Sequence, residues 1–195
     1  MSRIPGRRTL GAAMLCALGL TGCAPSGANA RQAEQAERGK YLVTVGGCND
    51  CHTPFKPGPQ GPEPDLSRAL SGHPESFPID GPATTSSPQW LMTMAATGTA
   101  FSGPWGVSFA ANLTPDDNTG LGIWTEDMFV KAMRTGRHMG VSRQILPPMP
   151  WNNIGAMTDD DLRALYAYLR SIPPLHNQVP EPIDTKGGLH AALAR

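Results

Sequence analysis

Apolar residues recur with helical spacing in two parts of the chain that also contain helix start and stop signals. The first part covers residues 32–45 and ends at Gly46-Gly47, because consecutive glycines favour the end of a helix. The second begins after Thr125, an N-cap residue followed by two acidic residues, and ends near Gly136. These signals predict one helix in each part.

A third helix is expected after Thr158, which is followed by three aspartates in the first turn. Pro173-Pro174 ends it. Its apolar positions have the i, i+3, i+4, i+7 spacing of one buried face: Leu162, Leu165, Tyr166 and Leu169. The helices near the two ends of the domain are too short to be stable alone, so we expect them to pack against each other or against a central group.

The segments between the helices are rich in glycine and proline, of which the 195 residues contain 22 and 20. The prolines of residues 53–88 exclude a regular helix, whereas residues 90–111 predict one or two short strands or a hairpin. Residues 112–122 and 137–157 read as loops. A chain with so much loop needs another source of rigidity, and a covalently held cofactor would provide one.

The N-terminus has the layout of an export signal. Three arginines precede an apolar run at residues 10–20, which is too short to span a bilayer. The Leu-Thr-Gly-Cys sequence that ends at Cys23 resembles a bacterial lipobox, which would lipidate Cys23, whereas an Ala-Asn-Ala triplet further on suits ordinary signal cleavage. We favour the lipobox because Cys23 follows the apolar run directly, and assign residues 1–22 to the signal peptide and 23–31 to a tether.

Removal of this signal would leave 13 basic and 16 acidic residues, a net charge of −3, and nothing in that balance suggests nucleic acid as a partner. A lipid anchor would hold the exported protein on the periplasmic side of a membrane without spanning it. Cys16 lies in the apolar run and Cys23 at the processing site, so only Cys48 and Cys51 remain for the folded domain.

These two cysteines form a C-x-x-C-H pattern with His52, which is the pattern of c-type haem attachment. Two thiols at this spacing can reach the two vinyl groups along one side of a porphyrin, and His52 then lies under the iron. The alternatives are a thioredoxin-like redox pair, half of a zinc site, or a structural disulfide. A redox pair would need a βαβ context, and a zinc site would need ligands from His73, His138 and His176, which show no ligand spacing.

Met149 is the best candidate for the second axial ligand of such an iron. It lies in the sequence Ile-Leu-Pro-Pro-Met-Pro-Trp, where the prolines fix φ and stiffen the loop. A methionine thioether is one such ligand in electron-transfer cytochromes, and it raises the potential of the haem iron. The alternative ligands are Met92, Met94 and Met139.

This order of elements resembles the class I c-type cytochromes over residues 32–174. Residues 112–124 and the sequence around Met149 are more specifically similar to the haem domains of cytochrome subunits of bacterial periplasmic dehydrogenases. The resemblance implies an all-α fold, with three main helices around one covalent haem c and a long Pro/Gly-rich insertion at residues 53–111 that has room for a short hairpin. Residues 175–195 would form a C-terminal tail.

The resemblance also implies roles for individual residues at the iron. Cys48 and Cys51 would form the thioethers, and His52 and Met149 would be the axial ligands. Pro64 would offer its carbonyl to the other imidazole nitrogen of His52.

Further roles implied by the resemblance concern packing. Leu66 would pack on the haem, and Trp151 would cover the haem near the axial methionine. Trp124 would bond a haem propionate. Gly39 would allow the first helix to approach the last near Leu165 and Tyr166.

Together these residues predict a mono-haem electron carrier and not an enzyme, because two axial ligands leave the iron no open coordination position. The implied partners are redox proteins: a dehydrogenase as donor, and an oxidase or another cytochrome as acceptor. The alternatives are a haem subunit of a dehydrogenase complex, an open-site haem enzyme or sensor if Met149 is not a ligand, and a lipoprotein without haem. Cytochrome subunits of this kind often carry two or three haems, whereas this chain has one C-x-x-C-H.

Overall fold

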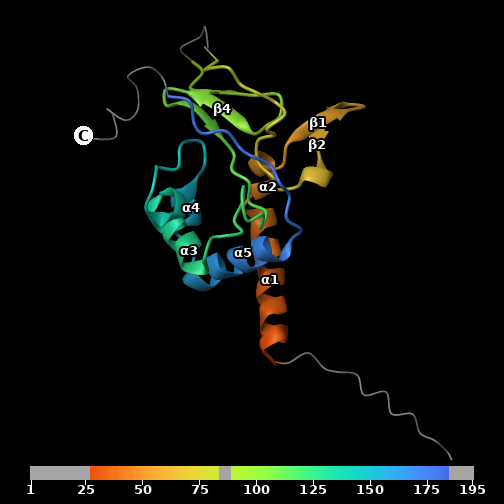
Figure 1. Cartoon of the computed structure of the whole chain (residues 1–195), viewed down its shortest axis with the longest axis vertical. Helices are drawn as coiled ribbons and strands as arrows, with labels where there is room; N and C mark the ends of the chain where they lie inside the picture. The colour runs from red at the N-terminus through yellow and green to blue at the C-terminus, as the bar shows by residue number, and fades with distance from the viewer. Residues whose placement is uncertain (1–26, 84–88, 185–195) are drawn as a thin grey trace, which may run out of the picture.

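The computed structural model describes residues 27–83 and 89–184. The predicted signal peptide, the lipidation site Cys23 and the end of the C-terminal tail lie outside this part of the chain. The α-helices are α1 (Gly27–Val45), α2 (Cys48–His52), α3 (Glu126–Thr135), α4 (Trp151–Ile154) and α5 (Asp159–Ser171) (Figure 1). None of the helices in the described ranges has the length and apolar character needed to cross a membrane.

The prediction of an all-α fold is wrong, because the insertion contains two antiparallel sheets. The first sheet is a hairpin of β1 (Phe55–Gly58) and β2 (Gly61–Pro64), and the second joins β3 (Thr93–Met94), β4 (Ala100–Gly103) and β5 (Gly106–Phe109). The hairpin expected within residues 90–111 is therefore present, whereas β1 and β2 lie where irregular chain was expected. Prolines are compatible with these two strands, because both are edge strands whose outer side needs no N–H donor.

The three predicted helices are confirmed as α1, α3 and α5. The hydroxyl of Thr125 accepts a hydrogen bond from the backbone N–H of Met128 (3.2 Å), and Gly136 ends α3 in the left-handed conformation with φ of 64°. The hydroxyl of Thr158 accepts from the N–H of Asp161 (3.2 Å) in the same way. The short helices α2 and α4 were not expected, because four or five residues leave no periodic pattern.

Helices α1 and α5 cross at Gly39 (Figure 1). A Cβ atom on Gly39 would lie 1.9 Å from the carbonyl oxygen of Ala164 and 2.8 Å from the Cβ of Tyr168. The two helices can therefore approach only because this residue has no side chain. The buried core that surrounds the crossing takes apolar side chains from α1, α3 and α5: Leu42, Val43, Phe129, Ala132, Met133, Leu162, Ala164, Leu165 and Leu169.

His73 ties the first part of the insertion to the turn between β3 and β4. Its fully buried ring donates from Nε2 to the carbonyl of Phe77 (2.8 Å), and Nδ1 lies 2.9 Å from the hydroxyl of Thr99. The carbonyl can only accept, so Nε2 holds the proton and Nδ1 accepts from Thr99. Burial lowers the pKa of His73 and outweighs the opposing effect of the hydrogen bond to Phe77.

The segment after α5 also packs against the body, although residues 175–195 were expected to form a tail. Asn177 is fully buried, and Ile183 pairs with Val107 of β5 through backbone hydrogen bonds of 2.8 and 3.0 Å. The described part of this segment therefore runs alongside β5 and is joined to it by an isolated antiparallel bridge.

Gly39→Ala should destabilise the protein by about 3 kcal/mol, because the new methyl group forces α1 and α5 apart. Thermal or urea unfolding measures the loss. Gly27→Ala, near the exposed start of the same helix and with no atom within 4 Å of the new Cβ, should leave stability unchanged or slightly raised. Equal stabilities of the two variants would contradict the close helix crossing.

Acid should destabilise the fold through His73. Its pKa is lowered in the folded state, so the unfolded chain binds more protons as the pH falls below the ordinary histidine pKa of about 6.5, and stability is lost in that range. His73→Gln should therefore lose less stability than the wild type between pH 7.5 and 5.5, as measured by thermal unfolding. A parallel loss in both proteins would show that the pKa of His73 is the same in the folded and the unfolded chain.

Candidate haem-binding site

The C-x-x-C-H motif forms the short helix α2 directly after α1. Gly47 makes the turn between the two helices in the left-handed region, with φ of 66°, which a glycine adopts without strain. Within α2, Cys51 and His52 follow Cys48 by three and four positions, so the three side chains are neighbours on one side of the helix. The groups that haem attachment requires therefore project from a single element.

The two thiols of α2 are partly buried, and they form no disulfide in the structure. Burial raises the pKa of Cys48 to about 11, and burial together with the carboxylate of Asp50 raises the pKa of Cys51. Both thiols are therefore protonated at neutral pH, whereas a redox-active C-x-x-C pair depends on a thiol of lowered pKa. Nor do the described residues contain a group of three or more His, Cys, Asp or Glu side chains that could hold a metal ion, as the zinc alternative would need.

His52 is buried and oriented by one hydrogen bond. Its Nδ1 lies 2.7 Å from the carbonyl oxygen of Ala111, which can only accept, so Nδ1 carries the proton. Burial lowers the pKa of His52, which keeps the ring neutral, and Nε2 has no hydrogen-bond partner among the described residues. A neutral imidazole with a fixed tautomer and a free Nε2 lone pair is the donor that a haem iron binds. The site therefore fits the predicted cofactor.

The carbonyl at Nδ1 of His52 belongs to Ala111 and not to Pro64, as the resemblance had implied. Pro64 is exposed at the end of β2, where it pairs with Phe55. The chain after His52 forms the β1–β2 hairpin, which includes Pro64. The carbonyl that contacts His52 comes instead from the segment that follows β5. No side-chain motif could have signalled Ala111, because it acts through its backbone.

Met149 lies in the loop before α4, partly buried against the same core as Cys48 and Trp124. The hydroxyl of Ser108 on β5 donates to the carbonyl of Pro147 at 2.5 Å, which anchors this loop to the sheet two residues before Met149. The stiffness expected from the prolines is therefore supplemented by a hydrogen bond that the sequence did not suggest. Ligation of iron by Met149 stays a prediction.

The remaining predicted haem contacts have other neighbours in the structure. Leu66 is 76% exposed in the 3-10 helix of residues 66–68. The ring of Trp124 meets the ring of His138 edge-on at 5.1 Å, and its carbonyl accepts from the hydroxyl of Tyr166 at 2.5 Å. Trp151 packs on Gly136 at the end of α3, where a Cβ would lie 2.4 Å from the indole. Their haem contacts stay predictions.

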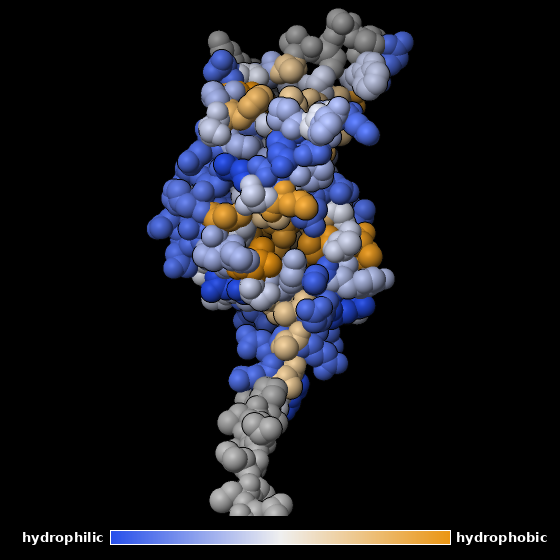
Figure 2. Space-filling view, turned by 90° about the vertical axis from the view of Figure 1, so that its right-hand side faces the viewer, coloured by the Kyte–Doolittle hydropathy of each residue, from blue (hydrophilic) through white to orange (hydrophobic). Residues whose placement is uncertain are grey.

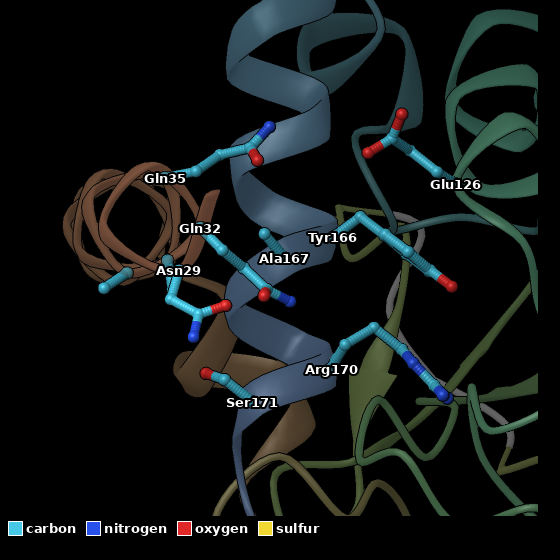
Figure 3. Close-up of a pocket in the computed structure, with 10 residues that line it drawn as sticks. Asn29, Gln32, Gln35, Glu126, Tyr166, Ala167, Arg170 and Ser171 are labelled. Atoms are coloured by element: carbon cyan, nitrogen blue, oxygen red, sulfur yellow. The ribbon is translucent and has the colours of Figure 1, made fainter. Parts of the chain in front are cut away.

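An apolar patch and a pocket lie at different places on the surface. Apolar side chains gather in the middle of one face of the body, with polar side chains around them (Figure 2). A separate pocket of about 480 Å³ lies between α1 and α5 (Figure 3), and it is lined by none of the predicted haem residues. Two polar side chains in its wall are already paired, Arg170 with the carbonyl of Gly122 (2.7 Å) and Glu126 with Arg163. We assign no ligand to this pocket.

Three curated proteins show what the chain is similar to. It is 30% identical over 156 residues to a subunit of nicotinate dehydrogenase of Pseudomonas putida strain KT2440, covering 80% of this chain and 10% of that protein. It is 29% identical over 174 residues to the cytochrome c subunit of alcohol dehydrogenase (quinone) of Gluconobacter oxydans, covering 86% and 29%. It is 29% identical over 158 residues to the fructose dehydrogenase cytochrome subunit of Gluconobacter japonicus, covering 78% and 25%. No family model matches the chain.

The chain resembles the cytochrome c subunits of bacterial dehydrogenases. The predicted resemblance is thereby confirmed, since these relatives are named as cytochrome subunits of dehydrogenases and not as their catalytic subunits. The chain spans between 10% and 29% of the length of the three relatives, so it corresponds to a part of each.

Cys51→Ser should leave the haem attached through Cys48 alone. One vinyl group then stays conjugated with the ring, so the pyridine haemochrome absorption should shift to longer wavelength while the haem stain on a denaturing gel persists. The double variant Cys48→Ser, Cys51→Ser should lose the stain. Asp50→Asn, in the same helix, should keep the wild-type spectrum; a stained double variant would contradict attachment at this motif.

Proposed function

We propose that this chain is a mono-haem c-type cytochrome that carries single electrons between a periplasmic dehydrogenase and a downstream acceptor. The observation that carries the proposal is the buried His52, whose Nδ1 is held by Ala111 (2.7 Å) and whose Nε2 is free of protein partners among the described residues. A histidine held in this way could also act as a general base, but His52 directly follows the thiol pair of Cys48 and Cys51, and this combination favours an iron ligand. One C-x-x-C-H motif gives one haem per chain.

The residues of this chain hold the cofactor and exclude other chemistry. Cys48 and Cys51 would form the thioethers, and His52 and Met149 would be the two ligands of the iron. Bound haem supplies an iron that gains and loses one electron. Ligation by both His52 and Met149 would raise the potential and would leave no coordination position for substrate. What the protein contributes is a potential and a surface on which partners dock, and such encounters are weak and involve small interfaces.

A second form of the proposal makes the chain a haem subunit bound to its dehydrogenase. The relatives that support it are named as cytochrome subunits of alcohol, fructose and gluconate dehydrogenases. In this form the donor is a tightly bound catalytic subunit rather than a diffusing protein. Co-purification of a dehydrogenase with the native chain at a fixed ratio distinguishes it from the free carrier.

We propose further that the protein is exported and anchored on the periplasmic side of the membrane through a lipid on Cys23. The helix α1 begins four residues later at Gly27, and its N-terminal half is largely exposed. Its 19 residues correspond to about 28 Å of helix. The start of α1 projects from the body at the end opposite to the three-stranded sheet (Figure 1), so it would act as a spacer between the membrane and the haem site.

Met149→Ala should convert the ferric haem from low spin to high spin and lower the midpoint potential by roughly 0.2 V, a part of the range that axial ligands span. Visible absorption and redox titration measure the two effects. The wild type should contain one haem per chain and show the weak long-wavelength band of methionine-ligated ferric haem. Met94→Ala, at a 56% exposed position on β3, serves as the control and should change neither property.

A high-spin ferric spectrum in the wild type would overturn the carrier and favour the open-site haem protein. A low-spin spectrum and an unchanged potential in Met149→Ala would reject Met149 as the ligand, and Met92, Met94 and Met139 would then be tested in turn.

A further inference from the structure

The carbonyl of Ala111 needs support, because Ala111 lies in a segment without regular secondary structure. The support comes from residues 70–73, which run beside this segment. The N–H of His73 donates to the carbonyl of Ala110 (2.9 Å), and the N–H of Leu113 donates to the carbonyl of Leu70 (2.9 Å). Residues 70–73 thus hold the chain on both sides of Ala111.

The same short segment also holds His52 itself. The backbone N–H of Gly72 donates to the carbonyl of His52 at 2.8 Å. Residues 70–73 therefore contact both partners of the hydrogen bond between Nδ1 of His52 and Ala111, and the position of one partner relative to the other depends on them.

Gly72 lies in direct contact with the carbonyl in question. Its φ is +78°, and a Cβ atom there would lie 2.6 Å from the carbonyl oxygen of Ala111 and 2.4 Å from that of Ala110. Both neighbours are backbone atoms, which cannot turn aside as a flexible side chain can. Any side chain at this position would displace the carbonyl that orients His52.

Asn177 fixes the residues on either side of Gly72. Its fully buried amide donates from Nδ2 to the carbonyls of Ser71 (2.7 Å) and His73 (2.8 Å). Its Oδ1 accepts from Arg68 (2.8 Å) and from the N–H of Glu75 (3.0 Å). All four hydrogen-bonding positions of the amide are used, so the side chain has one possible orientation.

We propose that Asn177 and Gly72 are positioning residues for His52. Asn177 fixes the backbone of residues 71 and 73 through its hydrogen bonds. Gly72, which has no side chain, allows this backbone to contact Ala111, whose carbonyl orients the imidazole. The proposal rests on the proposed function, because it takes His52 as an iron ligand. The hydrogen bond at Nδ1 makes the imidazole a stronger donor and favours ferric iron. A displaced carbonyl weakens that bond and makes the potential more positive.

The first test compares Gly72→Ala with Gly61→Ala in the haem-loaded protein. Both glycines have positive φ, +78° and +123°, but nothing lies within 4 Å of a Cβ at Gly61. Backbone strain is therefore common to both variants, and only Gly72→Ala meets the carbonyl. We expect Gly72→Ala to shift the proton resonance of Nδ1–H of His52 and to make the midpoint potential more positive. Gly61→Ala should keep both at wild-type values.

The second test is Asn177→Ala, which removes these hydrogen bonds of the Asn177 amide without a new clash. The same two shifts are expected, in the same direction, with low-spin ligation retained. Ser102→Ala is the control, because it also removes a hydrogen bond from a buried side chain to a backbone carbonyl (Ala83, 3.1 Å), but on β4. A purely structural role of Asn177 would lower thermal stability and leave the potential unchanged.

Wild-type potential and Nδ1–H resonance in both Gly72→Ala and Asn177→Ala would overturn the proposal. If Gly72→Ala does not yield folded protein, Asn177→Ala decides alone. A wild type without covalent haem would instead refute the proposed function and, with it, this role for Asn177. A wild type with low-spin haem and unresponsive variants would refute only the positioning role.

Discussion

The hydrogen bond from Nδ1 of His52 to the carbonyl of Ala111 is the interaction on which the site depends. A buried imidazole has two ring nitrogens, and only one of them is available to a metal once the other is committed as a donor. The bond fixes the tautomer and the ring plane together, and it joins two positions 59 residues apart. The end of the insertion, at Ala111, therefore has to lie within hydrogen-bond distance of His52, which directly precedes the insertion.

The insertion thus forms part of the site, although it reads from the sequence as excess loop. One strand, β5, serves both predicted axial positions: Ser108 holds the loop of Met149 through Pro147, and the chain that leaves β5 delivers Ala111 to His52. His73 fastens the first part of the insertion to the turn before β4 through Thr99. A small sheet is well suited to this task, because its hydrogen-bonded ladder holds distant segments in register.

The helices solve a separate problem, which is the rigid placement of the attachment motif. Gly39 allows α1 to pack closely on α5, and the left-handed turn at Gly47 redirects the chain so that α2 begins at once. The two thiols and the imidazole are then carried by an element that is braced at its start by the helical core. At its other end, the carbonyl of His52 is held by Gly72. The attachment motif and the insertion are thus joined by two hydrogen bonds at His52, one at its ring and one at its carbonyl.

The helices of the molecule could be predicted from the sequence, and the attachment motif could be recognised in it, because both depend on local patterns. Caps at Thr125 and Thr158 and the apolar face of α5 follow from spacing along one helix. The C-x-x-C-H pattern is equally local, since a single turn of helix brings its three groups to one side. The strands of the insertion were recognised only in part, because short edge strands that contain proline lack a clear alternating pattern.

The sequence by itself determined where the chain carries a haem-attachment motif and which class of protein it resembles. Only the tertiary structure decided what holds that chemistry in position: the carbonyl of Ala111 in place of Pro64, the glycine at position 72 and the amide of Asn177. The physical reason is that these residues act through backbone groups and buried contacts. Such contacts join segments distant in sequence, and they leave no signature in the order of side chains.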